Sequence, residues 1–322
     1  MTLRKPTVIV TRKLPEVVET RMMELFDVHL NSNDTPFDRA QLADTLATCD
    51  VLVPTLTDSL DAELLSASAH KVKLIANFGN GTDHIDVSAA QSAGIAVTNT
   101  PDVLTEDTAD MAMALIVAVP RRLVEGARMI DEDRFTGWSP THMLGRRMSG
   151  KRLGIIGMGR IGLAVAKRAR GFGMEIHYYN RNRLTPDLEK SAIYHKTVED
   201  LLPHCDVLSL HCPATPETVK LLNAKRIQLL PDGAIVVNTA RGAIIDEDAL
   251  ASALKTGKVA AAGLDVYAEE PTAQSIFKDI PNTFLMPHIG SATHDTRDAM
   301  GFRALDNLDA VFAGKEPRDR VA

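Results

Sequence analysis

Short runs of β-branched and other apolar residues alternate with helical spacing over the first hundred residues of the chain. Strands are predicted at 7–10, 51–53, 74–77 and 96–99, and helices at 37–48, 60–69 and 87–93. Strands that alternate with helices in this way are typical of a parallel sheet with helices on both faces. The first part of the chain is therefore predicted to be a doubly wound α/β unit.

The same alternation begins again after a long helical stretch. Residues 102–130 have helical spacing that is interrupted near Pro120, and a polar loop with Gly and Pro follows at 135–142. A second set of strands is then predicted at 153–156, 175–179, 206–210, 234–238, 260–264 and 283–286. The chain is therefore predicted to contain two doubly wound units.

The last stretch, 292–313, is predicted to be a helix. Its apolar spacing predicts a buried stripe made of Phe302, Leu305, Leu308 and Phe312. Periodicity alone does not assign this helix to either unit.

Composition narrows the class of protein. The 322 residues are enough for two domains, and 45% hydrophobic with 24% charged residues is typical of a globular protein in water. A formal net charge of −6 argues against a nucleic-acid partner. Three cysteines without a CxxC spacing argue against a disulfide framework or a metal site. No apolar run is long enough for a signal-peptide core or a membrane span, so a cytoplasmic protein is expected.

A glycine-rich loop follows the predicted strand 153–156 and opens a helical run. It matches GxGxxG and consists of Gly157, Met158, Gly159, Arg160, Ile161 and Gly162. The first glycine permits a tight turn, the second lets a pyrophosphate approach the backbone, and the third permits close helix packing. The helix N-terminus adds N–H donors and a positive dipole. The strand and helix around the loop predict a dinucleotide site.

The residues after the next strand bear on the choice of dinucleotide. An NAD-selective site usually has Asp or Glu at this position, whereas this chain has Asn180, followed by Arg181 and Arg183. Guanidinium groups suit a 2′-phosphate, so NADP(H) is predicted to be preferred, with NAD(H) also accepted. The alternative is that both arginines are solvated loop charges.

Three polar residues follow late strands and could carry chemistry. Arg241, Glu270 and His288 each lie where a predicted strand ends, and such strand ends face the ligand crevice of a parallel sheet. An imidazole can donate a proton near neutral pH, a neighbouring carboxylate favours its charged form, and a guanidinium can hold a substrate carboxylate. On position alone, Glu269 is an alternative to Glu270, and His211 is an alternative to His288.

Several motifs in order then make the chain resemble the D-isomer-specific 2-hydroxyacid dehydrogenases, most closely the glyoxylate/hydroxypyruvate reductases. Besides the glycine loop, the motifs lie at 77–86, 99–105, 211–218, 238–242, 264–271 and 287–292. The resemblance implies two Rossmann-like domains with the active site in the cleft between them. It implies a discontinuous substrate domain of 1–99 and 289–322, a dinucleotide domain of 100–288, and a homodimer.

The resemblance also implies roles for individual residues. Arg241, Glu270 and His288 become the catalytic set, with Arg241 and His288 also binding substrate beside the turn Asn80-Gly81. Further cofactor contacts are implied for Thr108, His211, Cys212, Pro213, Thr218, Thr239, Ala240 and Asp265. Cys212 is interpreted as a small packed residue, because hydride transfer needs no thiol. Trp138 is expected either to close a pocket across the dimer or to anchor local packing.

The expected activity is the reduction of small 2-keto acids. Glyoxylate would give glycolate and hydroxypyruvate would give D-glycerate, with a hydride from the nicotinamide and a proton from His288. The alternatives are a D-lactate or phosphoglycerate type of dehydrogenase, or a dinucleotide-binding module that acts like a corepressor.

Overall fold

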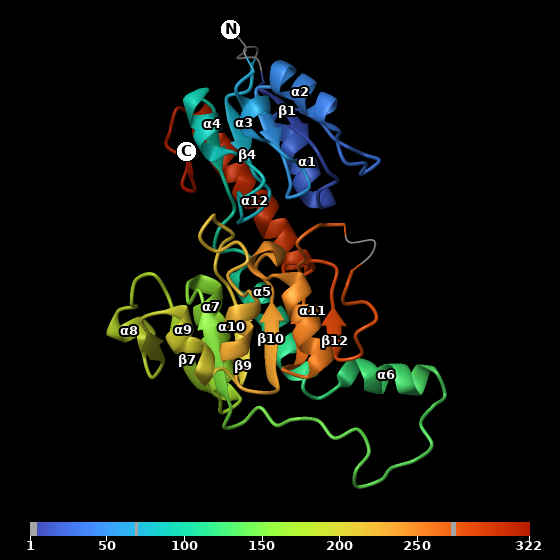
Figure 1. The fold of residues 1–322 in the computed structure, drawn as a ribbon. Coiled ribbons are helices and arrows are strands. Elements are labelled where there is room, and N and C mark those ends of the chain that lie inside the picture. Colours follow the sequence, from blue (N-terminus) through green and yellow to red (C-terminus); the bar gives the residue numbers. More distant parts are fainter. Residues whose placement is uncertain (1–4, 68–69, 272–274) are drawn as a thin grey trace. The chain divides into compact units, whose positions relative to one another are not determined.

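The computed structural model describes residues 5–67, 70–271 and 275–322, which form two compact units (Figure 1). One unit comprises Met1–Leu104 with Ser291–Ala322, and the other comprises Thr105–Gly290. The family resemblance predicts a division at residues 99–100 and 288–289. The assignment of substrate to the first unit and dinucleotide to the second remains a prediction.

The first unit contains a parallel five-stranded sheet with the strand order β2-β1-β3-β4-β5. Its strands are β1 (Thr7–Val10), β2 (Asp27–His29), β3 (Val51–Val53), β4 (Leu74–Ala76) and β5 (Ala96–Thr98). Its helices are α1 (Glu16–Leu25), α2 (Arg39–Thr48), α3 (Ala62–Leu65), α4 (Val87–Ser92) and α12 (His294–Phe312). The sequence missed β2, because this short edge strand has no buried residue and so carries no apolar signal.

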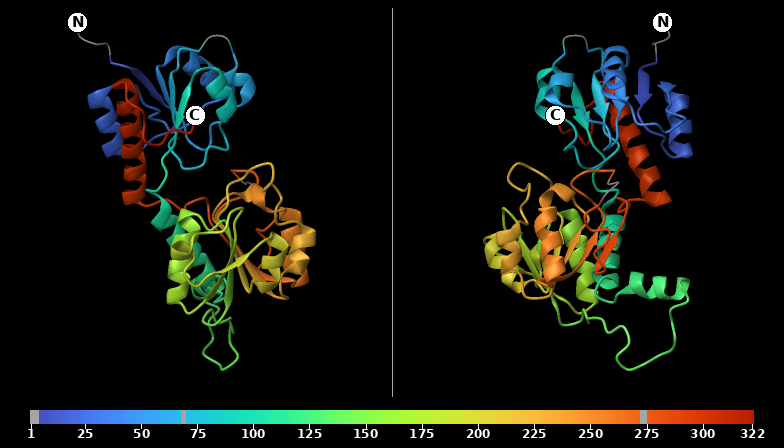
Figure 2. Two further views of the ribbon diagram at one scale, coloured as in Figure 1. Left: turned by 90° about the vertical axis from the view of Figure 1, so that its left-hand side faces the viewer. Right: turned by 45° about the vertical axis from the view of Figure 1, so that its right-hand side comes forward.

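The long helix α12 is part of the first unit and packs against α1 and β4 (Figure 2). Leu305 and Leu308 are buried as predicted, but Phe302 and Phe312 are 41% and 36% exposed, so that part of the predicted stripe is wrong. A Cβ added to Gly301 would lie 2.4 Å from Val18 on α1. Gly301 thus lets α12 and α1 approach each other closely and determines which face of α12 is packed. A pattern of large apolar residues does not reveal such a contact.

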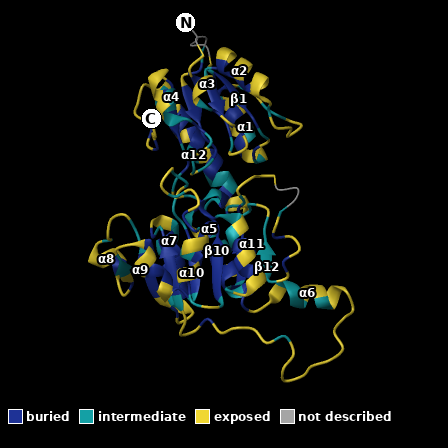
Figure 3. Cartoon of the chain, viewed as in Figure 1, coloured by how far each residue is buried: buried dark blue, intermediate teal, exposed yellow. Residues whose placement is uncertain are grey.

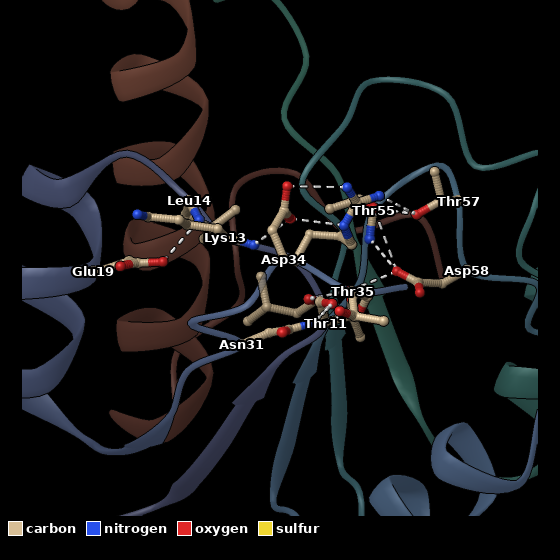
Figure 4. Close-up of polar contacts among 12 residues, drawn as sticks. Thr11, Lys13, Leu14, Glu19, Asn31, Asp34, Thr35, Thr55, Thr57 and Asp58 are labelled. Atoms are coloured by element: carbon tan, nitrogen blue, oxygen red, sulfur yellow. Dashed lines mark hydrogen bonds and ion pairs between the residues drawn. The ribbon is translucent and has the colours of Figure 1, made fainter. Parts of the chain in front are cut away.

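A polar network joins the strand ends of the first unit (Figure 4). Asp58, which is 1% exposed, accepts hydrogen bonds from the Thr11 hydroxyl at 2.5 Å and the Thr55 N–H at 2.7 Å. Arg12 and Asp34 form an ion pair at 2.8 Å near the surface. The buried carboxylate ties the end of β1 to the loop after β3, whereas the exposed pair contributes little to stability.

The second unit contains a parallel seven-stranded sheet with the order β12-β11-β10-β9-β6-β7-β8. The strands are β6 (Arg152–Ile156), β7 (Glu175–Tyr179), β8 (Ile193–His195), β9 (Val207–Leu210), β10 (Ala234–Asn238), β11 (Val259–Leu264) and β12 (Thr283–Leu285). The helices are α5 (Thr105–Ala118), α6 (Leu123–Asp131), α7 (Arg160–Gly171), α8 (Pro186–Glu189), α9 (Val198–Leu201), α10 (Ala224–Leu229) and α11 (Glu247–Thr256). Two short 3₁₀ helices are η1 (Leu202–His204) and η2 (Gly242–Ile244). The sheet order reverses between β6 and β9, which creates the switch point where such folds bind ligands.

Helices cover both faces of this sheet (Figure 2), its strands are mostly buried (Figure 3), and two hydrophobic cores form on it. Helices α5 and α7 contribute to one core, through residues such as Leu115 and Val165. Helices α9, α10 and α11 contribute to the other, through residues such as Leu201 and Leu250. The predicted doubly wound arrangement is therefore confirmed for this unit.

One segment of the second unit extends away from its sheet. Helix α6 has no buried residue, and the loop that follows it to residue 147 is almost entirely exposed (Figure 3). Pro120 lies between α5 and α6, where the sequence predicted an interruption. Among the residues that the structure describes, no helix is long and apolar enough to cross a membrane.

Candidate active site

The glycine loop lies between β6 and α7, at the switch point of the larger sheet. Gly157 has a φ of +93°, and a Cβ there would lie 2.5 Å from the Cys212 nitrogen. A Cβ on Gly162 would lie 2.5 Å from the Gly157 oxygen, whereas a Cβ on Gly159 would meet nothing within 4 Å. The first and third glycines are thus required for backbone packing. The open space beside Gly159 and the N-terminus of α7 fit the approach of a pyrophosphate.

The residues after β7 have contacts of their own. The Asn180 side-chain oxygen accepts a hydrogen bond from the Met158 N–H at 2.6 Å, so Asn180 holds the glycine loop. Arg183 forms an ion pair with Glu189 at 3.0 Å and lies over the ring of Tyr194. Arg181 has no hydrogen bond or ion pair among the described residues. Arg181 could therefore contact a 2′-phosphate without losing a hydrogen bond or ion pair. Arg183 would first have to give up its ion pair with Glu189.

The predicted cofactor segment 211–218 follows β9. Burial lowers the pKa of His211 to about 4, so its imidazole is neutral at physiological pH and is a poor proton donor. Burial raises the pKa of Cys212 to about 11, so this side chain is a thiol and not a nucleophilic thiolate. The Thr218 hydroxyl donates to the Pro213 carbonyl at 2.7 Å and shapes the loop.

Arg241 follows β10 and is held by the last residue of that strand. The Asn238 side chain donates to the Arg241 carbonyl at 2.8 Å and accepts from the Ala240 N–H at 3.0 Å. Asn238 is 1% exposed, so the turn that carries Arg241 is anchored in the core. Near this turn, the Thr239 hydroxyl is buried without a hydrogen-bond partner in the described structure, which fits a polar group of a ligand.

Glu270 and His288 form a close pair, although 18 residues separate them in the chain. The Nδ1 atom of His288 lies 2.6 Å from Oε2 of Glu270, and both side chains are about a quarter exposed. Burial alone would raise the pKa of Glu270. The hydrogen bond and charge of His288, the Tyr267 N–H and the charge of Arg241 outweigh that effect and lower the pKa. Glu270 is therefore a carboxylate that orients the imidazole and leaves Nε2 as the atom that can reach a substrate.

The backbone around His288 is held in an uncommon conformation. His288 has a φ of +55°, which costs on the order of 1–3 kcal/mol for a residue other than glycine. Asp265 compensates, because its carboxylate accepts from the N–H groups of Ile289 at 2.8 Å and Gly290 at 2.7 Å. Asp265 is 1% exposed, and burial raises its pKa against the effect of these two hydrogen bonds. Asp265 thus fixes the segment that follows His288, a role that the motifs did not suggest.

The turn Asn80-Gly81 belongs to the first unit and is held by side-chain hydrogen bonds. The Asn77 side chain donates to the carbonyls of Gly79 at 3.0 Å and Gly81 at 2.9 Å, and Asn99 donates to the Asn80 carbonyl at 2.8 Å. These contacts occupy the carbonyls of the turn. Within the described residues the N–H groups of Asn80 and Gly81 have no protein acceptor, so they can serve a carboxylate.

The structure thus assembles Glu270 and His288 directly and places Arg241 close enough to lower the Glu270 pKa. A Cβ added to Gly290 would lie 2.9 Å from Asp265 and 3.6 Å from Thr108, so these predicted cofactor residues also lie together. The parallel sheet carries a glycine loop, the unpaired Thr239 hydroxyl and the Glu270–His288 pair. Together these features are typical of a dinucleotide-dependent oxidoreductase.

Comparison with known proteins defines the family. Residues 113–290 match the sequence family of the D-isomer specific 2-hydroxyacid dehydrogenase, NAD-binding domain. The chain therefore belongs to the D-isomer specific 2-hydroxyacid dehydrogenases. A glyoxylate reductase of Thermococcus litoralis is 42% identical over 98% of this chain and 97% of its own length. A glycerate dehydrogenase of Hyphomicrobium methylovorum is 39% identical over 97% and 98% of the two chains.

A solved structure shows the same fold over nearly the whole chain. The NADPH-dependent glyoxylate/hydroxypyruvate reductase of Sinorhizobium meliloti, in complex with NADP and malonate, is 34% identical. It superimposes with a TM-score of 0.88 and covers 99% of this chain and 97% of its own. The predicted family resemblance and fold class are therefore confirmed.

Sequence reasoning overlooked two residues that shape this site. Gly242 and Tyr267 pack backbone to backbone, and a Cβ on Gly242 would lie 1.8 Å from the Tyr267 carbonyl carbon. Gly242 follows Arg241 and Tyr267 precedes Glu270 by three positions, so both lie inside motifs that were quoted for other residues.

Proposed function

We propose that this protein is an NADPH-preferring reductase of small 2-keto acids, with glyoxylate and hydroxypyruvate as substrates. The single observation that carries the proposal is the 2.6 Å contact between His288 and Glu270, in the unit that also holds the glycine loop. The names of the relatives, glyoxylate reductase and glycerate dehydrogenase, support the substrate class.

The chain's own residues would divide the reaction among them. The glycine loop and Asp265 would hold the dinucleotide, which supplies a hydride to the carbonyl carbon when it is bound. Arg241 would bind the substrate carboxylate and polarise the keto oxygen, together with the N–H groups of Asn80 and Gly81. His288 would donate the Nε2 proton to the keto oxygen, which becomes the hydroxyl of the product. Glu270 would stabilise the imidazolium before that transfer.

The preference for NADPH is supported by three observations. No carboxylate follows β7 at the position of Asn180, and the guanidinium of Arg181 makes no hydrogen bond or ion pair among the described residues, although its charge acts on Glu217. The Sinorhizobium relative, whose structure contains NADP, is named as NADPH-dependent.

We further propose that the protein is a homodimer, because α6 and the following loop expose large apolar side chains.

A steady-state comparison tests the activity. Glyoxylate, hydroxypyruvate, pyruvate and phenylpyruvate would each be assayed with NADPH and with NADH. We expect the highest kcat/KM for the first two substrates with NADPH. Equal or better rates with NADH would contradict the cofactor preference. No oxidation of either cofactor across the panel would favour a dinucleotide-binding module instead of an enzyme.

A further inference from the structure

Tyr267 contacts the two segments that carry the proposed acid pair. Its N–H donates to Oε1 of Glu270 at 2.9 Å, on the carboxylate whose other oxygen contacts His288. Its hydroxyl donates to the Met286 carbonyl at 2.9 Å. Met286 precedes His288 by two positions, with Pro287 between them, and proline restricts the backbone that joins the two. One residue therefore links the Glu270 loop to the end of β12.

The third segment of the site also packs against Tyr267. The backbone of Gly242, next to Arg241, approaches Tyr267 so closely that an added Cβ would lie 1.8 Å from its carbonyl carbon. On the other side, the N–H of Ala268 donates to Glu247 at 2.8 Å, at the first residue of α11. The position of Tyr267 is thus fixed by two elements that do not carry the acid pair.

We propose that Tyr267 is a positioning residue for the reduction, and that its hydroxyl holds Glu270 and His288 at hydrogen-bond distance. The inference rests on the proposed roles of Arg241, Glu270 and His288. The side chain of Tyr267 lies between segments and is not required to touch substrate. Without the hydroxyl, the end of β12 keeps its backbone hydrogen bond to Leu264 and the contacts of Asp265, but it loses the one side-chain contact that joins it to Tyr267, three residues before Glu270.

The hydroxyl can act as this donor over the whole range of an assay. Burial, with added contributions from the nearby carboxylates of Asp265, Glu270 and Glu247, raises the pKa of Tyr267 to about 12. The phenol therefore remains protonated wherever the reduction would be measured.

The substitution Tyr267→Phe tests the inference, because it removes one hydroxyl and keeps the ring. We expect kcat for glyoxylate to fall about tenfold, with the Kd for NADPH unchanged. In a crystal structure of the variant, His288 Nδ1 and Glu270 Oε2 should lie farther apart than in the unmodified protein.

Tyr178→Phe is the matched control. Tyr178 lies on β7, and its hydroxyl also makes hydrogen bonds, with Leu184 and Glu189. This variant should lose a similar amount of thermal stability but keep the kcat of the unmodified protein and its short His288–Glu270 distance. If Tyr267→Phe behaves like this control, the hydroxyl is merely structural and the inference is wrong. If the unmodified protein reduces no keto acid, the proposed function fails, and the His288–Glu270 distance in the two crystal structures still decides the positioning role.

Discussion

His288 is the residue on which the proposed chemistry most depends. Nδ1 contacts Glu270, and Nε2 has no acceptor among the described residues, so only one ring nitrogen is available to a substrate. His288→Ala should lower kcat for glyoxylate by roughly 10²–10⁴-fold, the usual contribution of a general acid. The Kd for NADPH, measured by fluorescence titration, should stay within about twofold of the unmodified value, because the glycine loop lies elsewhere in the unit.

Glu269→Gln is a matched control for this experiment. Glu269 lies beside Glu270 in the chain, but no hydrogen bond joins it to His288. Its substitution should leave kcat within about twofold. A kcat close to normal in His288→Ala would remove the residue from the reaction.

At the scale of single residues, the sequence suggested which residues could form the site but not the hydrogen bonds that hold them. The motifs favoured Glu270 over Glu269 and His288 over His211, and these roles remain predictions. The structure places Glu270 and His288 in contact at 2.6 Å, and burial lowers the pKa of His211. The contacts of Asp265 and Tyr267 could not be predicted. They depend on backbone N–H and carbonyl groups from distant segments, which the identities of the residues do not encode.

The glycine loop offers a prediction at the scale of the element, because its glycines differ in what surrounds them. Gly159→Ala adds a Cβ that meets no protein atom within 4 Å but would project toward an approaching pyrophosphate. We expect the Kd for NADPH to rise roughly tenfold or more, with little change in Tm. Gly162→Ala should instead lower the Tm, because its Cβ would lie 2.5 Å from the Gly157 oxygen.

Calorimetric titration and thermal unfolding of the two variants separate these effects. A Gly159→Ala protein that binds NADPH as tightly as the unmodified protein would show that the dinucleotide does not approach this backbone. Gly159 has a φ of −83°, which alanine adopts without strain. The Gly159→Ala substitution should therefore not disturb the backbone of the loop.

The edge of the larger sheet carries a cluster of His177, His195 and His204, from β7, β8 and η1. His177 Nδ1 and His195 Nε2 lie 2.9 Å apart, and the three ring centroids are 5.0–5.3 Å from one another. Burial lowers the pKa of His177 against the effect of Glu175, which lies 2.7 Å away. Burial also lowers the pKa of His195, with further effects from the charges of its two histidine neighbours.

These shifts predict how stability depends on pH. Because the folded-state pKa values lie below the ordinary value of 6.5, the unfolded chain binds protons first as the pH falls. The Tm should therefore drop between pH 7.5 and pH 5.5. His195→Gln should reduce that drop, on the order of 1–3 °C, whereas His29→Gln, at an exposed position, should not. An identical drop in all three proteins would mean that the cluster does not control this dependence.

At the scale of elements, the sequence predicted most strands and helices correctly, and its failures have physical causes. Buried parallel strands such as β6, β9 and β10 are continuous apolar runs and were found. The edge strands β2 and β8 have no fully buried residue, so their sequences resemble loops. Helix α12 was located correctly, but its packed face was not.

At the scale of the whole molecule, the restart of the strand–helix pattern predicted two units, and the structure has two. What periodicity could not supply was the membership of the last helix. Helix α12 packs on α1 and β4, elements that precede it by more than two hundred residues. Contacts of such long range leave no periodic signal, and only the family resemblance indicated a discontinuous unit.

The exposed segment of the larger unit leads to a prediction about assembly. Helix α6 has nine residues and no buried side chain, and an isolated helix of this length is marginal in water. Ile130, Trp138 and Leu144 are 60%, 81% and 67% exposed, so Trp138 is not a local packing anchor. Large apolar side chains gathered on one extended segment are typical of an interface. We expect the protein to sediment at twice the chain mass of 35.0 kDa.

Charged substitutions in the segment test whether it forms that interface. The double variant Ile130→Asp/Leu144→Asp should shift the sedimentation equilibrium toward the monomer, with a Kd for dimer dissociation raised at least about a hundredfold. Met23→Asp is the matched control, because Met23 is also half exposed but lies on α1 in the other unit. A monomeric unmodified protein at micromolar concentration would contradict the dimer. A double variant that remains as dimeric as Met23→Asp would show that the subunits associate through another surface.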